Sequence, residues 1–123
     1  MDVTRKLIAM GLLLLVTLVT GFWRGNAGNP ALSGTVHKLL GLACVIYSAI
    51  VLYHTARPIQ FGTAYYAAIA VLLVSMVALI ASGSLLTVPR ANTTAWLALH
   101  RIASALAAIA AFVTARLLIL SKP

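Results

Sequence analysis

Four long stretches of apolar residues, separated by short polar segments, dominate the chain. They cover residues 7–23, 35–55, 64–86 and 95–120, and each is close to the roughly 17–25 residues that a helix needs to cross a bilayer. Prolines and glycines gather between the stretches, as helix boundaries require, and Thr63 and Thr94 are expected N-caps. The pattern predicts an all-α fold: a four-helix transmembrane bundle with up-down topology, forming a single domain over residues 1–123.

The composition supports a membrane location. Of the 123 residues, 63% are hydrophobic and only 8% are charged, whereas soluble domains have about 45–50% apolar and about 25% charged residues. An ordinary water-soluble fold and a disordered chain are therefore excluded, and a lipid bilayer is the expected environment. We expect the stretch 7–23 to be a retained helix rather than a cleaved signal peptide, in a bacterial or archaeal plasma membrane.

The charge balance is strongly basic, with nine Lys and Arg residues against a single acidic residue, Asp2. The basic residues are scattered among the apolar stretches, which indicates anchoring at the membrane surface rather than binding of nucleic acid. Since Asp2 lies outside every apolar stretch, no carboxylate is available within the membrane for proton-coupled transport. This weighs against the small four-helix multidrug transporters.

Aromatic and basic residues indicate where the membrane surfaces lie. One surface is expected to hold Phe22, Trp23 and Trp96, and the other Tyr53, Phe61, Tyr65 and Tyr66. The side that carries both termini has five basic residues and the opposite side has four: respectively Arg5, Lys6, Arg57, Arg116 and Lys122, and Arg24, Lys38, Arg90 and Arg101. This small excess predicts cytoplasmic termini.

Two histidines stand near the start of the second and fourth predicted helices. His37 is expected about two residues into its helix and His100 about five into its own, and in an up-down bundle these helices run in the same direction. The two imidazoles would then lie at a similar depth near the same membrane face. Histidines from two such helices can fill both axial positions of one haem iron, so His37 and His100 are the predicted metal ligands.

The residues around these histidines fit a haem. Each histidine is followed four residues later by a small residue, Gly41 or Ser104, which lies on the same helix face and would leave room for a porphyrin. Each is also followed directly by a cation, Lys38 or Arg101, which could meet a haem propionate. Plain helix packing also uses small residues, and cations at helix ends commonly reach towards the membrane surface, so these alternatives stay open.

The two segments also form a faint internal repeat. Residues 37–41 read HKLLG and residues 100–104 read HRIAS, 63 residues further on. This spacing suggests two related helical hairpins. His54 belongs to the opposite membrane surface, and its counterpart at the same offset is Leu117, so we expect one haem b per chain. Cys44 is alone in the sequence and is expected to be a packing residue.

The two histidine–cation segments resemble those of small four-helix membrane b-type cytochromes. This group includes cytochrome b561-like proteins and the cytochrome b subunits of membrane hydrogenases and formate dehydrogenases. The resemblance implies haem b, electron transfer, and a quinone or another redox subunit as partner, in a homo- or hetero-oligomer. Many members carry two haems and four histidines, whereas this chain has three histidines.

Two other classes of function stay open. The chain could be a haem-free membrane scaffold or assembly subunit, since its loops are short and its small residues suit tight helix packing. A holin-like pore former would account for the small size and the terminal cations, but not for the placement of the histidines. Filled axial positions favour electron transfer over substrate turnover, so a non-catalytic role is the leading prediction.

Overall fold

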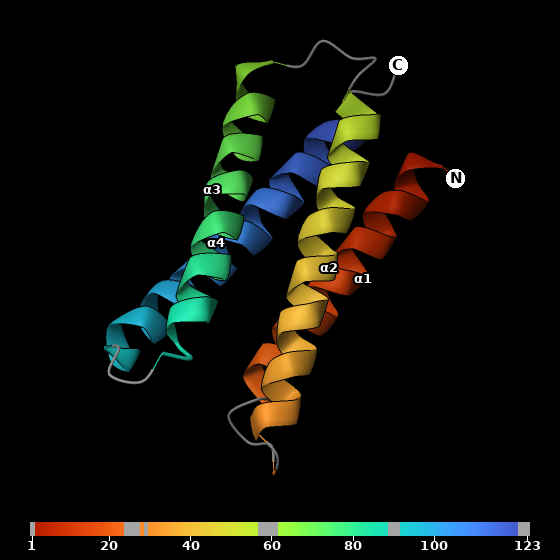
Figure 1. Cartoon of the computed structure of the whole chain (residues 1–123). Helices are drawn as coiled ribbons and strands as arrows, with labels where there is room; N and C mark the ends of the chain where they lie inside the picture. Colours follow the sequence, from red (N-terminus) through yellow and green to blue (C-terminus); the bar gives the residue numbers. More distant parts are fainter. Residues whose placement is uncertain (1, 24–27, 29, 57–61, 89–91, 121–123) are drawn as a thin grey trace. The chain divides into compact units, whose positions relative to one another are not determined.

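Four α-helices make up the fold in the computed structural model, which describes residues 2–23, 28, 30–56, 62–88 and 92–120. They are α1 (Val3–Trp23), α2 (Pro30–Ala56), α3 (Thr63–Leu85) and α4 (Thr93–Leu120) (Figure 1). The predicted all-α class with four helices is confirmed. The chain divides into two compact units, Met1–Ile59 and Gln60–Pro123, so each unit is a helical hairpin and is described by itself. The expected single domain stays a prediction.

The helix starts differ from those expected. α2 begins at Pro30, five residues before the apolar stretch, because proline suits the first helical position, where no N–H is needed. Gly62 and not Thr63 is the N-cap of α3. At α4 the cap is Asn92, whose Oδ1 accepts a hydrogen bond from the Ala95 N–H at 3.2 Å, so the prediction of Thr94 as N-cap is wrong. Asparagine is a better cap than threonine.

The first hairpin consists of α1 packed against α2. Buried or half-buried residues of α2 recur at steps of three and four, at positions 34, 37, 41, 44, 48, 51 and 55, and those of α1 do so at positions 7, 10, 14, 17 and 21. This heptad-like spacing is typical of left-handed packing, in which membrane helices cross at about +20°. The seam of the first hairpin, defined by these positions, therefore contains His37.

The second hairpin has the same kind of seam between α3 and α4. On α4 the steps of three and four run through positions 96, 100, 103, 107, 110 and 114, and on α3 through positions 65, 68, 72, 75, 79 and 82. The small residues Ala103, Ala107 and Ala110 on α4 are at most 4% exposed, which allows close approach of the helices. His100 belongs to this seam of the second hairpin.

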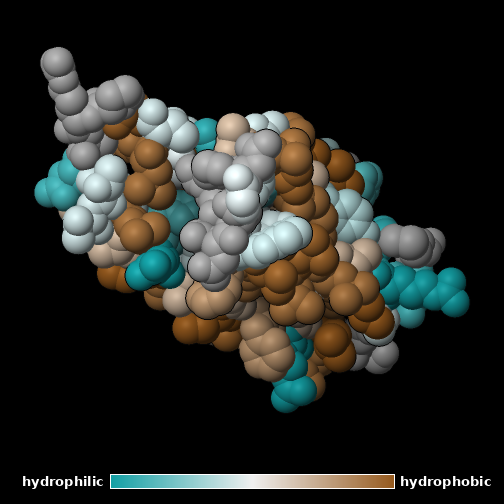
Figure 2. Space-filling model, turned by 90° about the horizontal axis from the view of Figure 1, so that it is seen from below, coloured by the Kyte–Doolittle hydropathy of each residue, from teal (hydrophilic) through white to brown (hydrophobic). Residues whose placement is uncertain are grey.

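The remaining helix surfaces are apolar and exposed. Val74 on α3 and Phe112 on α4 are 70% and 68% exposed, and hydrophobic residues cover much of the surface seen in Figure 2. All four helices are long and apolar enough to cross a membrane. Since outward apolar side chains suit lipid, this supports an integral membrane protein in a lipid bilayer.

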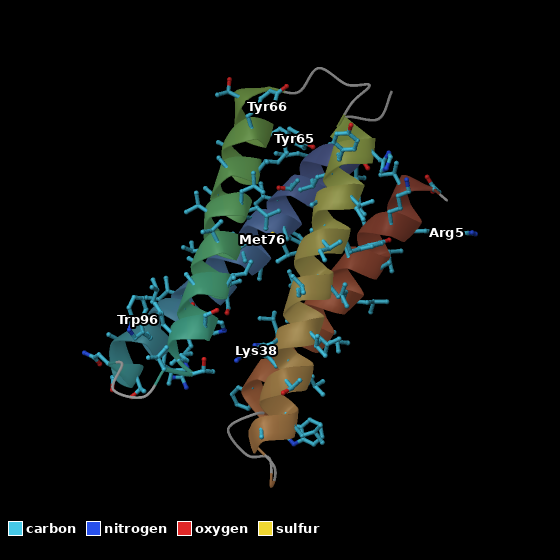
Figure 3. The ribbon with its side chains drawn as sticks, viewed as in Figure 1. Arg5, Lys38, Tyr65, Tyr66, Met76 and Trp96 are labelled. Atoms are coloured by element: carbon cyan, nitrogen blue, oxygen red, sulfur yellow. The ribbon has the colours of Figure 1, made fainter. Side chains whose placement is uncertain are left out.

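The predicted aromatic bands are found in part. Phe22 and Trp23 are exposed in the last turn of α1, and Tyr53 and Tyr66 are exposed at the other ends of their hairpins. Tyr65, labelled with Tyr66 in Figure 3, is in the first turn of α3 but only 2% exposed, so its place in the aromatic band stays a prediction. It occupies a seam position of α3, where packing covers its ring. Phe61 lies outside the described residues.

Candidate functional site

His37 is held against the end of α1. A β-carbon placed on Gly21 would lie 2.7 Å from His37 Cε1 and 3.2 Å from its Nδ1, so the imidazole ring rests directly on the glycine backbone. The preceding residue, Thr20, has its Oγ1 3.3 Å from His37 Nδ1. Only glycine provides the space for this close approach. The ring is half-buried.

His100 is held in the same manner against the end of α3. A β-carbon on Gly83 would lie 3.4 Å from His100 Cε1, and the preceding residue, Ser82, has its Oγ 2.8 Å from His100 Nδ1. Ser82 is fully buried, while the imidazole itself is half-buried. The hydroxyl–glycine–imidazole arrangement of the first hairpin is thus repeated in the second.

The two arrangements also occupy matching places in their hairpins. Each histidine stands seven residues after the first residue of its helix, Pro30 or Thr93, and each glycine stands two residues before its helix ends at Trp23 or Leu85. The expected depths of about two and about five residues are therefore wrong, because both helices begin earlier than the apolar stretches do. Seven residues correspond to about 10 Å along a helix, so each imidazole lies well inside its hairpin.

The small residues predicted beside the histidines lie within their own hairpins. Gly41 faces α1: a β-carbon on it would lie 3.9 Å from Thr17 Cγ2. Ser104 donates its hydroxyl proton to the His100 carbonyl at 2.7 Å, a local bond that satisfies the side chain on its own helix. Both residues are half-buried, and the observed contacts are those of helix packing.

The cations predicted beside the histidines are exposed. Lys38 on α2, labelled in Figure 3, and Arg101 on α4 are classed as exposed residues. Each follows its histidine directly, so it lies about 100° further around the helix and leaves the seam. Each cation is therefore at the depth of its histidine but not packed in the hairpin.

His54 has a different environment. It is exposed in the last turn of α2, and its ring meets that of Tyr53 edge to face, with centroids 5.5 Å apart. Among the described residues, no hydroxyl–glycine pair contacts it. Its Leu117 counterpart on α4 is half-buried. His54 thus lacks the surroundings that His37 and His100 share.

The sequence prediction missed four residues of this arrangement: Thr20, Gly21, Ser82 and Gly83. The signal was present, since a hydroxyl residue followed by glycine stands near the end of both the first and the third apolar stretch, 62 residues apart. The histidines are 63 residues apart because the connection between α3 and α4 is one residue longer than that between α1 and α2. The repeat therefore covers both helices of each hairpin.

Histidine is the only metal-binding residue type in this arrangement. Within the described part of the chain, no group of three or more His, Cys, Asp or Glu residues could hold a metal ion. A zinc site with three protein ligands accordingly has no basis there, whereas a haem takes only one or two ligands from the protein. No family model, no curated protein and no solved structure matches the chain.

Proposed function

We propose that the chain is an integral membrane b-type cytochrome that carries one haem b between the axial ligands His37 and His100 and transfers electrons to or from a membrane redox complex. The observation that carries this proposal is the duplicated hydroxyl–glycine–imidazole arrangement. Each hairpin provides one half-buried imidazole, seven residues after the first residue of its helix. The repeat thus supplies two imidazoles, the number that fills both axial positions of one haem iron.

The chemistry of the two imidazoles suits this role. Neutral imidazole is a good ligand for haem iron. Four successive membrane crossings alternate in direction, so α2 and α4 would begin on the same side of the bilayer. Equal distances from the helix starts would then bring both imidazoles to one depth, as ligation of a single iron requires.

Other residues would assist in binding the cofactor. Lys38 and Arg101 are exposed at the depth of the histidines and would pair with the haem propionates or with lipid headgroups. Gly41 and Ser104 remain proposed neighbours of the cofactor because each lies one helical turn after its histidine, although their described contacts are within their own hairpins. When bound, the haem supplies one-electron redox chemistry, and a quinone or a second redox subunit is the proposed partner.

Haem content after substitution of each histidine tests the proposal. Purified wild-type protein should show a six-coordinate b-type spectrum with one haem per chain by pyridine haemochrome assay. His37→Ala and His100→Ala should each lose most of this haem, because each removes one axial ligand. His54→Ala is the matched control and should keep the full amount.

Three results would count against this function. A colourless wild-type protein would favour the haem-free scaffold, and unchanged haem in both alanine variants would exclude His37 and His100 as ligands. A ratio of two haems per chain, halved by His54→Ala, would show that His54 also ligates.

A further inference from the structure

The hydroxyl groups that touch the two imidazoles have a role beyond packing. Ser82 Oγ lies 2.6 Å from the Ala78 carbonyl oxygen and 3.3 Å from that of Leu79. A serine hydroxyl has a single proton, and a carbonyl oxygen can only accept. The Ser82 proton is therefore directed to these carbonyls, and an oxygen lone pair remains for His100 Nδ1 at 2.8 Å.

The same proton count applies in the first hairpin. Thr20 Oγ1 donates to the Thr17 carbonyl at 2.9 Å and lies 3.3 Å from His37 Nδ1. In both hairpins the hydroxyl is thus left as the acceptor towards Nδ1, a geometry that favours a ring proton on Nδ1. A neutral imidazole carries one proton, so Nε2 of each histidine keeps its lone pair, as a metal ligand needs.

We infer that Thr20 and Ser82 are positioning residues that select the Nδ1–H tautomer of His37 and His100, turn Nε2 into the ligating atom, and lower the redox potential of the bound haem. The redox part of this inference rests on the proposed function. A hydrogen bond donated by Nδ1–H makes Nε2 a stronger donor to the metal, and a stronger donor favours ferric over ferrous iron.

The two positions are not equivalent. The contact of Ser82 with its histidine is 0.5 Å shorter than that of Thr20 (2.8 against 3.3 Å), and Ser82 is fully buried. Hydrogen bonds weaken beyond about 3.2 Å and are stronger where water is excluded. Ser82 therefore exerts the larger effect, and His100 is the more firmly oriented ligand.

The tautomers can be read without reference to haem. The full-length chain, labelled with ¹⁵N in its histidine rings and kept in detergent micelles without haem, should show the Nδ1–H form for His37 and His100 by long-range ¹H–¹⁵N correlation. In Ser82→Ala the His100 signal should lose this preference while His37 keeps it. An Nε2–H form of both rings in the wild-type chain would overturn the inference, whatever the haem content.

The haem-loaded chain tests the redox part by potentiometric titration. Ser82→Ala should raise the midpoint potential by about 59 mV if the lost hydrogen bond favours ferric over ferrous iron tenfold, and should weaken haem binding by about 10–100-fold. Thr20→Val should shift the potential in the same direction by less. Ser82→Thr, which restores a hydroxyl, should bring the potential back towards that of the wild type.

Matched controls separate positioning from packing. Ser75 stands one heptad before Ser82 on the same seam, is 4% exposed, and donates to the Val71 carbonyl at 2.7 Å. Thr17 is the corresponding control on α1 and donates to the Leu13 carbonyl at 2.8 Å. Ser75→Ala and Thr17→Val should leave tautomers and potential unchanged. A shift of the midpoint potential in Ser75→Ala as large as in Ser82→Ala would refute the inference. Absence of haem from the wild type and every variant would refute the proposed function, and the tautomers of His37 and His100 would then still test the inference about Thr20 and Ser82.

Discussion

The two glycines that face the histidines should respond differently to the same substitution. Gly21→Ala places a methyl group 2.7 Å from His37 Cε1, whereas Gly83→Ala places one 3.4 Å from His100 Cε1. The first distance lies well inside van der Waals contact of about 3.5–4.0 Å between carbon atoms, and the second is close to it. The His37 ring must move in the first variant, and the His100 ring barely in the second.

The two substitutions form a matched pair, so their difference isolates the steric effect. Both glycines stand two residues before the end of their helix, where replacing glycine by alanine gains at most about 0.5–1 kcal/mol of helix stability. This gain is common to both variants. Overpacking costs about 1–3 kcal/mol and applies only to Gly21→Ala, which should therefore be less stable than Gly83→Ala by about that amount.

Unfolding in mixed micelles with increasing SDS, followed by circular dichroism, measures this difference. Gly83→Ala should match or exceed the wild type, and Gly21→Ala should unfold at lower SDS. Because displaced His37 also leaves Thr20, Gly21→Ala should lose haem more readily as well. Equal stability of the two variants would refute the reasoning, since it would mean that the His37 ring does not rest on Gly21.

Two further predictions concern packing and topology. Leu72→Ala should lower the free energy of unfolding by about 2–5 kcal/mol, because it opens a cavity at a side chain that is 0% exposed. Leu73→Ala should change it little, because that side chain is 51% exposed and lipid can fill the space. Equal losses of stability in SDS unfolding would contradict the α3–α4 packing. Reporter fusions should place both termini in the cytoplasm, as the excess of basic residues predicts; a fusion active only on the opposite side would reverse this orientation.

The existence and character of the helices could be predicted from the sequence because they depend on local properties. An apolar stretch about as long as a bilayer is thick must satisfy its own backbone hydrogen bonds, which forces a helix whatever its neighbours are. His37 and His100 could also be identified from the sequence, since ionisable residues are rare in such stretches. The helix starts were less certain, because Pro30 and Asn92 act through backbone geometry that hydropathy does not express.

The surroundings of the histidines depended on the packing of two helices. A hydroxyl and a glycine become partners of a histidine 16–18 residues later only when the antiparallel register of a hairpin brings them level, and hydropathy does not specify that register. The sequence alone therefore left Thr20 and Ser82 as ordinary hydroxyls within the membrane spans. The tertiary structure decided that they contact imidazole nitrogens, and that Tyr65 is covered by packing although its neighbour Tyr66 is exposed.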